Sequence, residues 1–373
     1  MSLKVLDFIK THPDWETLLV EEPYCLTTKW DGDYFLLKYN QFSSDFSNPI
    51  VKECRGSIFY KHPNNGQIQC VCMPFFKFGN FGESYADNID WATAQVMEKV
   101  DGSLIKIWYH NGWHISTNGN INAYNTENAA YEGMTFGDVV DMALGGRTED
   151  FLNVLSKDFT YMFELVSPYT RVTIFYPETQ LYYLSSRNMV SMQEHIVCSS
   201  SKAFDEFNIK YPKYYSLTSL SDCIDAVNQM SKDEEGFVVV DADYHRIKIK
   251  SPEYLFASRA RNNGAITTRT ILELMRENKI DDFLGYCPDY KELVDKVLNA
   301  YKQLRDDMEA QWYAYSTETT NLSKKDFAIS IKNCTYKGYL FKRFDNRVIN
   351  AEEYLQNLCL SSLIDLIKTM QND

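Results

Sequence analysis

The chain reads Glu98-Lys99-Val100-Asp101-Gly102-Ser103, and the apolar residues Leu104, Ile105 and Ile107 follow directly. Recurrent β-branched and apolar residues predict a strand from Ser103, and the Asp-Gly pair runs directly into it. The amine of Lys99 would therefore be held in a fixed position next to the start of a strand. A lysine can act as a nucleophile when its surroundings favour the neutral amine.

A second lysine stands two residues before an Asp-Gly pair, in Lys29-Trp30-Asp31-Gly32. Asp33 and Tyr34 follow this pair, in place of a small hydroxyl residue and an apolar strand. We therefore favour Lys99 as the nucleophile and interpret Lys29 as a turn residue.

The composition indicates a soluble globular protein with two or three domains. The chain has 373 residues, of which 45% are hydrophobic and 24% are charged. A net charge of −13 argues against a protein that coats nucleic acid through bulk electrostatics, although local basic grooves remain compatible with it. No apolar run approaches the roughly 20 residues that span a bilayer, so we expect no membrane association.

The nine cysteines are scattered and no secretory signal precedes them, which predicts reduced thiols in a cytoplasmic protein. Cys70 and Cys72 form the only close pair. Few histidines and no second pair stand nearby, so the sequence does not predict a zinc site.

Period-two patterns dominate the first 250 residues and predict antiparallel strands. One hairpin is expected around the turn-rich Pro63-Asn64-Asn65-Gly66, and another around Asn111-Gly112, because Asn-Gly favours two-residue hairpin turns. The predicted strands are 34–39, 57–60, 68–73, 103–109, 114–118, 159–166, 171–176, 181–187, 234–240 and 246–250.

The segment 246–250 has an unusual distribution of charge. Arg246, Lys248 and Lys250 fall on one face of the predicted strand, and Ile247 and Ile249 fall on the other. Three cations along one strand face are costly unless something anionic lies above them.

After about residue 255 the hydrophobic period changes to that of helices. The apolar residues from Leu293 to Trp312 recur at three- and four-residue spacing and predict one face of a long helix. Ser323 resembles the start of a capping box, and Asn350 opens a last helix towards Met370. We thus predict an α+β, antiparallel-sheet domain at residues 1–255, a linker at 259–264, and an all-helical domain at 256–373.

Transfer of a nucleotide to an enzyme lysine needs several partners, and the sequence offers a candidate for each. The triphosphate needs cations and a divalent metal ion to disperse developing charge. Lys248 and Lys250 would hold phosphate oxygens and favour the neutral form of the Lys99 amine. Arg55 and Lys77 would clamp the outer phosphates.

Two carboxylates complete this set of candidates. Glu235 would bind a metal ion or its water, and Glu164, on an apolar strand, would bind the ribose or the metal ion. Each of these residues alone has a structural interpretation, as a solvated strand-end lysine or a satisfied core carboxylate. It is the occurrence of all these residues together, in this order along the chain, that indicates a nucleotidyltransferase.

Four segments, in this order, resemble nucleotidyltransferase motifs I, III, IV and V of the covalent ligase and capping-enzyme superfamily. They are Lys99-Val-Asp-Gly-Ser, Phe163-Glu164, Glu235-Gly236-Phe237-Val238 and Lys248-Ile-Lys250. More narrowly, further residues resemble the RNA ligase 1 family of T4-like bacteriophages, over most of residues 50–260. They are Glu53-Cys54-Arg55-Gly56, Lys77, Pro168, Arg171, Ser251 and Tyr254.

The resemblance implies an ATP-dependent RNA ligase that uses Mg²⁺ or Mn²⁺. Lys99 would form a lysyl-AMP phosphoramidate, AMP would pass to a 5′-phosphate RNA end, and a 3′-hydroxyl would displace it. Glu98, Asp101 and Gly102 would join the nucleotide site. The family further suggests tRNA repair, a monomer, and a host-cell cytoplasm if the gene is phage-encoded.

One segment departs from the family pattern. Where the family typically has a Ser-Lys-Gly-Ser turn after motif I, this chain has Thr117-Asn118-Gly119-Asn120. A phosphate or 5′-end contact that the family's lysine supplies would be weaker here or come from elsewhere.

Two alternatives remain open at this point. A DNA ligase or a capping guanylyltransferase would typically continue into an OB-type barrel after motif V, whereas this chain shows helical periodicity. A non-catalytic RNA-binding protein would have a degenerate pocket, whereas all core motif residues are present. In the C-terminal domain, a basic set interleaved with aromatic residues either contacts RNA or forms a solvated helix face: Lys332, Lys337, Lys342, Arg343 and Arg347.

Overall fold

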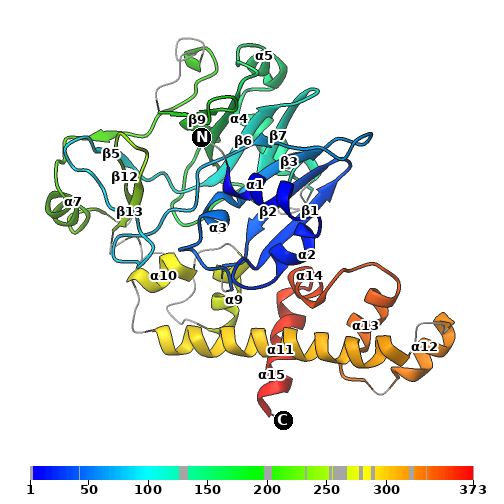
Figure 1. Cartoon of the computed structure of the whole chain (residues 1–373). Coiled ribbons are helices and arrows are strands. Elements are labelled where there is room, and N and C mark those ends of the chain that lie inside the picture. Colours follow the sequence, from blue (N-terminus) through cyan, green and yellow to red (C-terminus); the bar gives the residue numbers. More distant parts are fainter. Residues whose placement is uncertain are drawn as a thin grey trace. The chain divides into compact units, whose positions relative to one another are not determined.

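The computed structural model describes residues 3–41, 43–125, 133–196, 204–231, 233–251, 254, 267–276, 280–286, 290–318, 323–332 and 334–372. The chain divides into two compact units, 1–261 and 262–373 (Figure 1). The predicted linker at 259–264 lies outside the described residues. No helix in the described ranges has the length and apolar character needed to cross a bilayer.

The first unit contains a four-stranded antiparallel sheet, sheet A, in the order β1-β2-β3-β4. Its strands are β1 (Leu26–Asp31), β2 (Tyr34–Tyr39), β3 (Arg55–Lys61) and β4 (Ile68–Cys72). The hairpin around residues 63–66 is confirmed. Strand β1 contains Lys29 and was not predicted, because its sequence Leu-Thr-Thr-Lys-Trp-Asp shows little alternation.

Both faces of sheet A are covered. On one face, Phe35, Leu37 and Tyr39 pack against three helices, α1 (Lys4–Thr11), α2 (Trp15–Val20) and α3 (Pro49–Glu53). On the other face, Leu36 and Ile58 pack against Trp108 of the next sheet. Sheet A is therefore the outer layer of a two-sheet stack.

Sheet C is the central layer, with five strands in the order β10-β9-β8-β6-β7. They are β6 (Ser103–Tyr109), β7 (Trp113–Thr117), β8 (Phe159–Val166), β9 (Gln180–Asn188) and β10 (Glu194–His195). The Asn111-Gly112 hairpin is confirmed, and both residues have positive φ, as such turns require. The face away from sheet A is covered by α4 (Phe136–Ala143) and α5 (Thr148–Asn153), through residues such as Val139, Val140 and Phe151.

Sheet B has the order β11-β5-β12-β13. Its strands are β5 (Gln95–Glu98), β11 (Tyr214–Tyr215), β12 (Gly236–Val240) and β13 (Arg246–Lys250). Helix α7 (Leu220–Val227) covers the face that carries Ile247 and Ile249, so the predicted alternation in β13 is confirmed. The cations of β13 occupy the opposite face.

The prediction of a strand at 171–176 is wrong. The backbone N–H groups of Thr173 and Ile174 donate to Asp101 Oδ2 at 2.8 and 2.7 Å. Because these groups bond to a side chain, they do not form a strand ladder, and the segment is an irregular loop.

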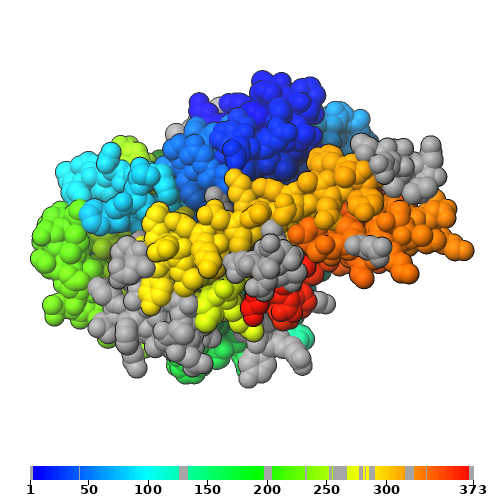
Figure 2. Space-filling model, turned by 90° about the horizontal axis from the view of Figure 1, so that it is seen from below, coloured from blue at the N-terminus to red at the C-terminus, as the bar shows by residue number. Residues whose placement is uncertain are grey.

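The second unit is helical over its described residues. Its helices are α9 (Thr268–Arg276), α10 (Ile280–Tyr286), α11 (Lys291–Glu318), α12 (Lys324–Ser330), α13 (Lys337–Phe344), α14 (Ala351–Gln356) and α15 (Leu360–Asn372). Buried Val297, Tyr301, Leu304 and Met308 confirm the middle of the predicted stripe on α11, whereas its predicted ends Leu293 and Trp312 are half-buried and Val294 is buried instead. Helix α15 packs across α11 (Figures 1 and 2).

The helix predicted to run from Asn350 towards Met370 is instead two helices. Asn350 is the N-cap of α14, as predicted, but α14 ends at Gln356. Arg276 Nη2 donates to the carbonyl oxygens of Leu355 and Leu358 at 3.2 and 2.6 Å. This side chain from α9 satisfies carbonyl groups at the end of α14, which stabilises the break.

Candidate active site

Lys99 lies on the connection between sheets B and C. It follows the last residue of β5, and β6 begins four residues later. Its backbone N–H donates to the Gly236 carbonyl oxygen at 2.8 Å, and the adjacent Val100 is buried. The backbone of Lys99 is therefore fixed to the start of β12.

Glu235 bridges two lysines. Its Oε2 lies 2.7 Å from Lys99 Nζ, and its Oε1 lies 3.0 Å from Lys250 Nζ. Glu235 is 3% exposed, so this carboxylate is largely removed from water. The structure brings together Lys99, Glu235 and Lys250, three of the residues proposed from the sequence.

Gly236 is needed for this arrangement. Its φ is +136°, and a Cβ at this position would lie closer than 3.0 Å to the Ile249 carbonyl and to Lys250 Cα. Only glycine lets β12 begin this close to β13. The glycine thereby places Glu235 beside the end of β13.

Glu164 lies on β8, opposite Leu104 of β6. Its Oε1 accepts a hydrogen bond from the Gly102 N–H at 3.1 Å. Burial raises the pKa of Glu164 to about 7; Lys99 opposes this shift and Glu235 adds to it. The two candidate metal-binding carboxylates are thus close enough to repel each other.

Asp101 organises the loop next to the site. It is 4% exposed, and besides its two bonds to the backbone of the 171–176 loop it accepts one from Tyr254 Oη at 3.0 Å. Tyr254 is one of the residues on which the family resemblance rests. The structure thus gives Asp101 a positioning role through its hydrogen bonds.

Arg55 and Lys248 approach the same aromatic ring. The Arg55 guanidinium lies 5.5 Å and the Lys248 ammonium 5.2 Å from the centre of the Phe78 ring. Arg55 Nη1 is buried and has no hydrogen-bond acceptor among the residues that the structure describes. A buried guanidinium nitrogen without an acceptor could donate to an anionic ligand.

Two further predicted residues lie in other surroundings. The Lys77 ammonium is enclosed by the rings of Tyr39, Phe46 and Tyr85, at 5.2, 4.4 and 5.6 Å from their centres. Glu98 Oε2 accepts a hydrogen bond from the Lys213 N–H at 3.1 Å. The clamp role of Lys77 and the nucleotide-binding role of Glu98 stay predictions.

The rival nucleophile Lys29 lies on β1. Its Nζ donates to Asn120 Oδ1 at 3.2 Å. Asn120 belongs to the turn that departs from the family pattern. Lys99, by contrast, has a carboxylate and a second lysine beside it.

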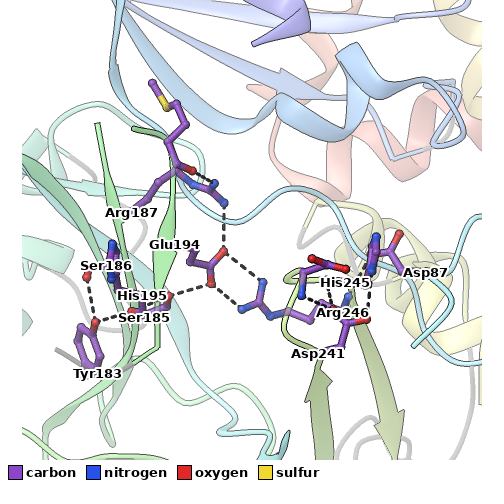
Figure 3. A network of polar contacts seen from close by, with 12 residues as sticks. Asp87, Tyr183, Ser185, Ser186, Arg187, Glu194, His195, Asp241, His245 and Arg246 are labelled. Atoms are coloured by element: carbon purple, nitrogen blue, oxygen red, sulfur yellow. Dashed lines mark hydrogen bonds and ion pairs between the residues drawn. The ribbon is translucent and has the colours of Figure 1, made fainter. Parts of the chain in front are cut away.

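The partner of Arg246 is a residue that the sequence pattern does not indicate. Glu194 of β10 lies between the guanidinium groups of Arg246 and Arg187, at 2.6 and 3.1 Å (Figure 3). All three side chains are buried, so this network joins β13 to sheet C through fully enclosed charges. Glu194 stands in a short, turn-rich segment that gives no pattern, so no local signal pointed to it.

Over the described residues, no group of three or more histidine, cysteine or acidic side chains is placed to hold a metal ion. Mg²⁺ commonly binds one or two carboxylates together with phosphate oxygens and water. Glu164 and Glu235 fit this requirement, because their mutual repulsion would be relieved by a divalent cation. The donor set therefore fits a metal ion that arrives with a nucleotide.

The basic set of the second unit is partly used inside that unit. Arg343 pairs with Glu309 and contacts Tyr339, which is fully buried. Phe344 stacks on Phe327. The exposed members are Lys332, Lys337, Lys342 and Arg347. Base stacking by Tyr339 is therefore not favoured, whereas phosphate pairing by the exposed cations stays a prediction.

A family model described as RNA ligase, of the T4 type, matches residues 53–254. This range contains Arg55, Lys99, Glu164, Glu235 and Lys250. The chain belongs to the RNA ligase family.

Two relatives resemble most of the chain. A putative bifunctional polynucleotide kinase/RNA ligase of Autographa californica nuclear polyhedrosis virus is 33% identical over 360 residues, covering 91% of this chain and 49% of the viral protein. An RNA ligase of Rhodothermus phage RM378 is 26% identical over 382 residues, covering 84% of this chain and 85% of the phage protein. The chain thus spans about half the length of the first relative.

Among solved structures, an archaeal ATP-dependent RNA ligase is similar over 79% of this chain and 78% of its own, with 12% identity and a TM-score of 0.46. A Naegleria gruberi RNA ligase with ATP and Mn is similar over 62% of this chain and 88% of its own, with 12% identity and a TM-score of 0.36.

Proposed function

We propose that this RNA ligase family member seals RNA ends in an ATP-dependent reaction that passes through a lysyl-AMP intermediate on Lys99. The observation that carries the proposal is the Glu235 bridge, with Lys99 Nζ at 2.7 Å and Lys250 Nζ at 3.0 Å. A nucleophile, a carboxylate and a phosphate-binding cation meet at one point. The Lys99 side chain remains 19% exposed. A purely structural ion pair does not require an exposed partner, whereas a nucleophile must be accessible to its substrate.

In the first step, Lys99 Nζ loses a proton and attacks the α-phosphorus of ATP. A P–N bond forms, the bond to the bridging α–β oxygen breaks, and pyrophosphate leaves. Lys248, Lys250 and Arg55 would bind the phosphate oxygens that gain charge. A divalent metal ion held by Glu164 and Glu235 would supply further charge neutralisation.

In the second step, an oxygen of an RNA 5′-phosphate attacks the same phosphorus, the P–N bond breaks, and AMP is joined to the RNA end. In the third step, a 3′-hydroxyl attacks the RNA 5′-phosphorus, a phosphodiester bond forms, and AMP leaves. The cations of the site serve all three steps, because a phosphorus atom reacts each time.

The second unit would select the RNA. Its exposed cations Lys332, Lys337, Lys342 and Arg347 support contacts with phosphates. Repair of a cleaved tRNA, the use of Mg²⁺ or Mn²⁺, and action as a monomer belong to the same proposal.

The test is covalent labelling. The full chain is incubated with Mg²⁺ and either [α-³²P]ATP or [α-³²P]GTP, denatured, and examined for retained label. We expect label from ATP that is lost in Lys99→Ala and retained in Lys29→Ala. A label that survives in Lys99→Ala, or that comes only from GTP, would contradict the proposal.

A second experiment addresses the substrate. The labelled enzyme is offered 5′-phosphorylated single-stranded RNA, the same RNA as a nicked duplex, and matched DNA. We expect AMP transfer and circularisation with single-stranded RNA. Sealing confined to DNA would refute an RNA ligase.

A further inference from the structure

Four cations gather between sheets A and C, and we name them the basic cluster: Lys29, Lys38, Arg55 and Lys106. Lys38 on β2 is directly opposite Arg55 on β3. The ladder between β2 and β3 shifts its register between Leu37 and Lys38, so this pair lies at a β-bulge or irregularity. Lys38 is thus the cross-strand neighbour of the cation that the active site uses.

Lys106 enters from the facing sheet. It lies on β6, is fully buried, and its Nζ donates to the carbonyl oxygen of Gly56, the residue after Arg55. Burial lowers the pKa of Lys38 to about 8, and Lys29 and Lys106 add to this effect. Three lysines therefore influence one another in this small space.

The basic cluster borders the turn at Thr117–Asn120. A Cβ added at Gly119 would lie 3.6 Å from Lys38 Nζ, and one added at Gly56 would lie closer than 3.0 Å to the Asn118 carbonyl oxygen. Lys29 is hydrogen-bonded to Asn120. The turn itself carries no cation, so its positive surroundings come from β1 and β2.

Two cations of the basic cluster, Lys38 and Arg55, have few hydrogen-bond acceptors or carboxylates among the described residues. For the Lys38 side chain, the structure gives no hydrogen bond or ion pair with any residue in the described ranges, and Lys38 is half-buried by its exposed surface. Arg55 Nη1 is buried without an acceptor there. Like charges on opposed strand positions destabilise a sheet, and a bound anion would offset this cost.

We propose that Lys38, together with Arg55, binds a phosphate group of the substrates at the Asn118–Gly119 turn. The inference rests on the proposed function, since ligation brings two such groups to the site. They are the outer phosphates of ATP and the 5′-phosphate of the RNA. Both are oxygen-rich anions that a lysine and an arginine bind in the same way.

The test compares Lys38→Gln and Lys38→Arg with a control, Lys61→Gln. Lys61 is an exposed lysine at the far end of β3, so its replacement removes the same charge from the same sheet. One arm measures KM for ATP in enzyme labelling. The other arm starts from labelled enzyme and measures KM for 5′-phosphorylated RNA in AMP transfer.

We expect Lys38→Gln to raise KM about 10- to 100-fold in one arm, as loss of a charge-assisted hydrogen bond does. A rise for ATP identifies the outer phosphates, and a rise for RNA identifies the 5′-end. Lys38→Arg should restore most of the affinity. Unchanged KM in both arms, or equal effects of Lys61→Gln, would overturn the inference and leave the proposed function intact.

Thermal unfolding separates this role from a structural one. Because Lys38→Gln relieves like-charge repulsion, the melting temperature of the ligand-free chain should stay the same or rise, and a clear fall would overturn the inference. If the wild-type chain takes no label, the proposed function fails. Calorimetric titration with inorganic tripolyphosphate then tests the phosphate site by itself. If the wild type and Lys38→Gln bind tripolyphosphate with equal affinity, the phosphate site is overturned as well.

Discussion

Lys99 Nζ and Glu235 Oε2 lie 2.7 Å apart, although 136 positions separate the two residues in the sequence. Glu235 also binds Lys250, so one buried carboxylate balances two ammonium groups. Removing that carboxylate would leave two neighbouring cations without their shared partner.

Glu235→Gln should lower the free energy of unfolding by about 3–5 kcal/mol, because it breaks a buried ion pair and leaves uncompensated charge. It should also abolish labelling by ATP. Urea unfolding and the labelling assay measure the two effects. The control is Glu234→Gln, an exposed neighbouring glutamate, which should change neither. Equal effects of the two variants would show that Glu235 has no special role.

Gly236→Ala should also prevent labelling, because its Cβ would collide with the backbone of Ile249 and Lys250 and displace Glu235. Gly66→Ala is the matched control. Gly66 has φ +68°, but nothing lies within 4 Å of an added Cβ. It should cost only about 1–2 kcal/mol of backbone strain and leave labelling intact. Retained labelling in Gly236→Ala would contradict the steric argument.

Lys106→Met should change how stability depends on pH. Burial lowers the pKa of Lys106 to about 8, from 10.5. Between these values the unfolded chain holds more protons than the folded chain, so raising the pH favours the folded wild type. The wild type should therefore gain up to about 3 kcal/mol over Lys106→Met from pH 8 to 10.5, and no difference should develop below pH 7. Urea unfolding across this range measures it, with Lys61→Met as control.

Glu194→Gln should lower the free energy of unfolding by about 3–5 kcal/mol, because it leaves Arg187 and Arg246 buried with less compensation. Asp150→Asn breaks the exposed pair with Arg147 and should cost less than about 1 kcal/mol. Because Arg246 lies two residues before Lys248, Glu194→Gln should also raise KM for ATP. A variant as stable as the wild type would contradict the assignment of Glu194 as the partner of both arginines.

Local pattern was sufficient for much of the fold. The strand around Glu164 and the alternation in β13 are confirmed, because one face of each strand packs on a core. The strand proposed at 171–176 failed for a non-local reason: Asp101, about 70 residues away, binds the backbone amides. The helix break after Gln356 likewise depends on Arg276 from α9.

The candidate site shows the same limit. The order of the motifs predicted that Lys99, Glu235 and Lys250 belong to one site. In the structure the three side chains are in contact. No local sequence pattern indicated a role for Lys38 or Glu194. Lys38 is brought near Arg55 by the pairing of β2 with β3, and Glu194 meets its two arginines where β10 lies beside β13. The interpretation of Lys29 as a turn residue is wrong, because Lys29 lies on β1 and its Nζ donates to Asn120, which is 91 positions away.

The position of Lys99 between sheets B and C has one more consequence. Glu235 directly precedes β12, an inner strand of sheet B, and Glu164 belongs to β8 of sheet C, while the backbone of Lys99 is tied to Gly236 and leads into β6. The angle between the two sheets therefore sets the separation of the carboxylates and the reach of the amine together. A small rotation of one sheet relative to the other would therefore change two properties together. These are the affinity of the proposed metal site and the alignment of the Lys99 amine with its substrate.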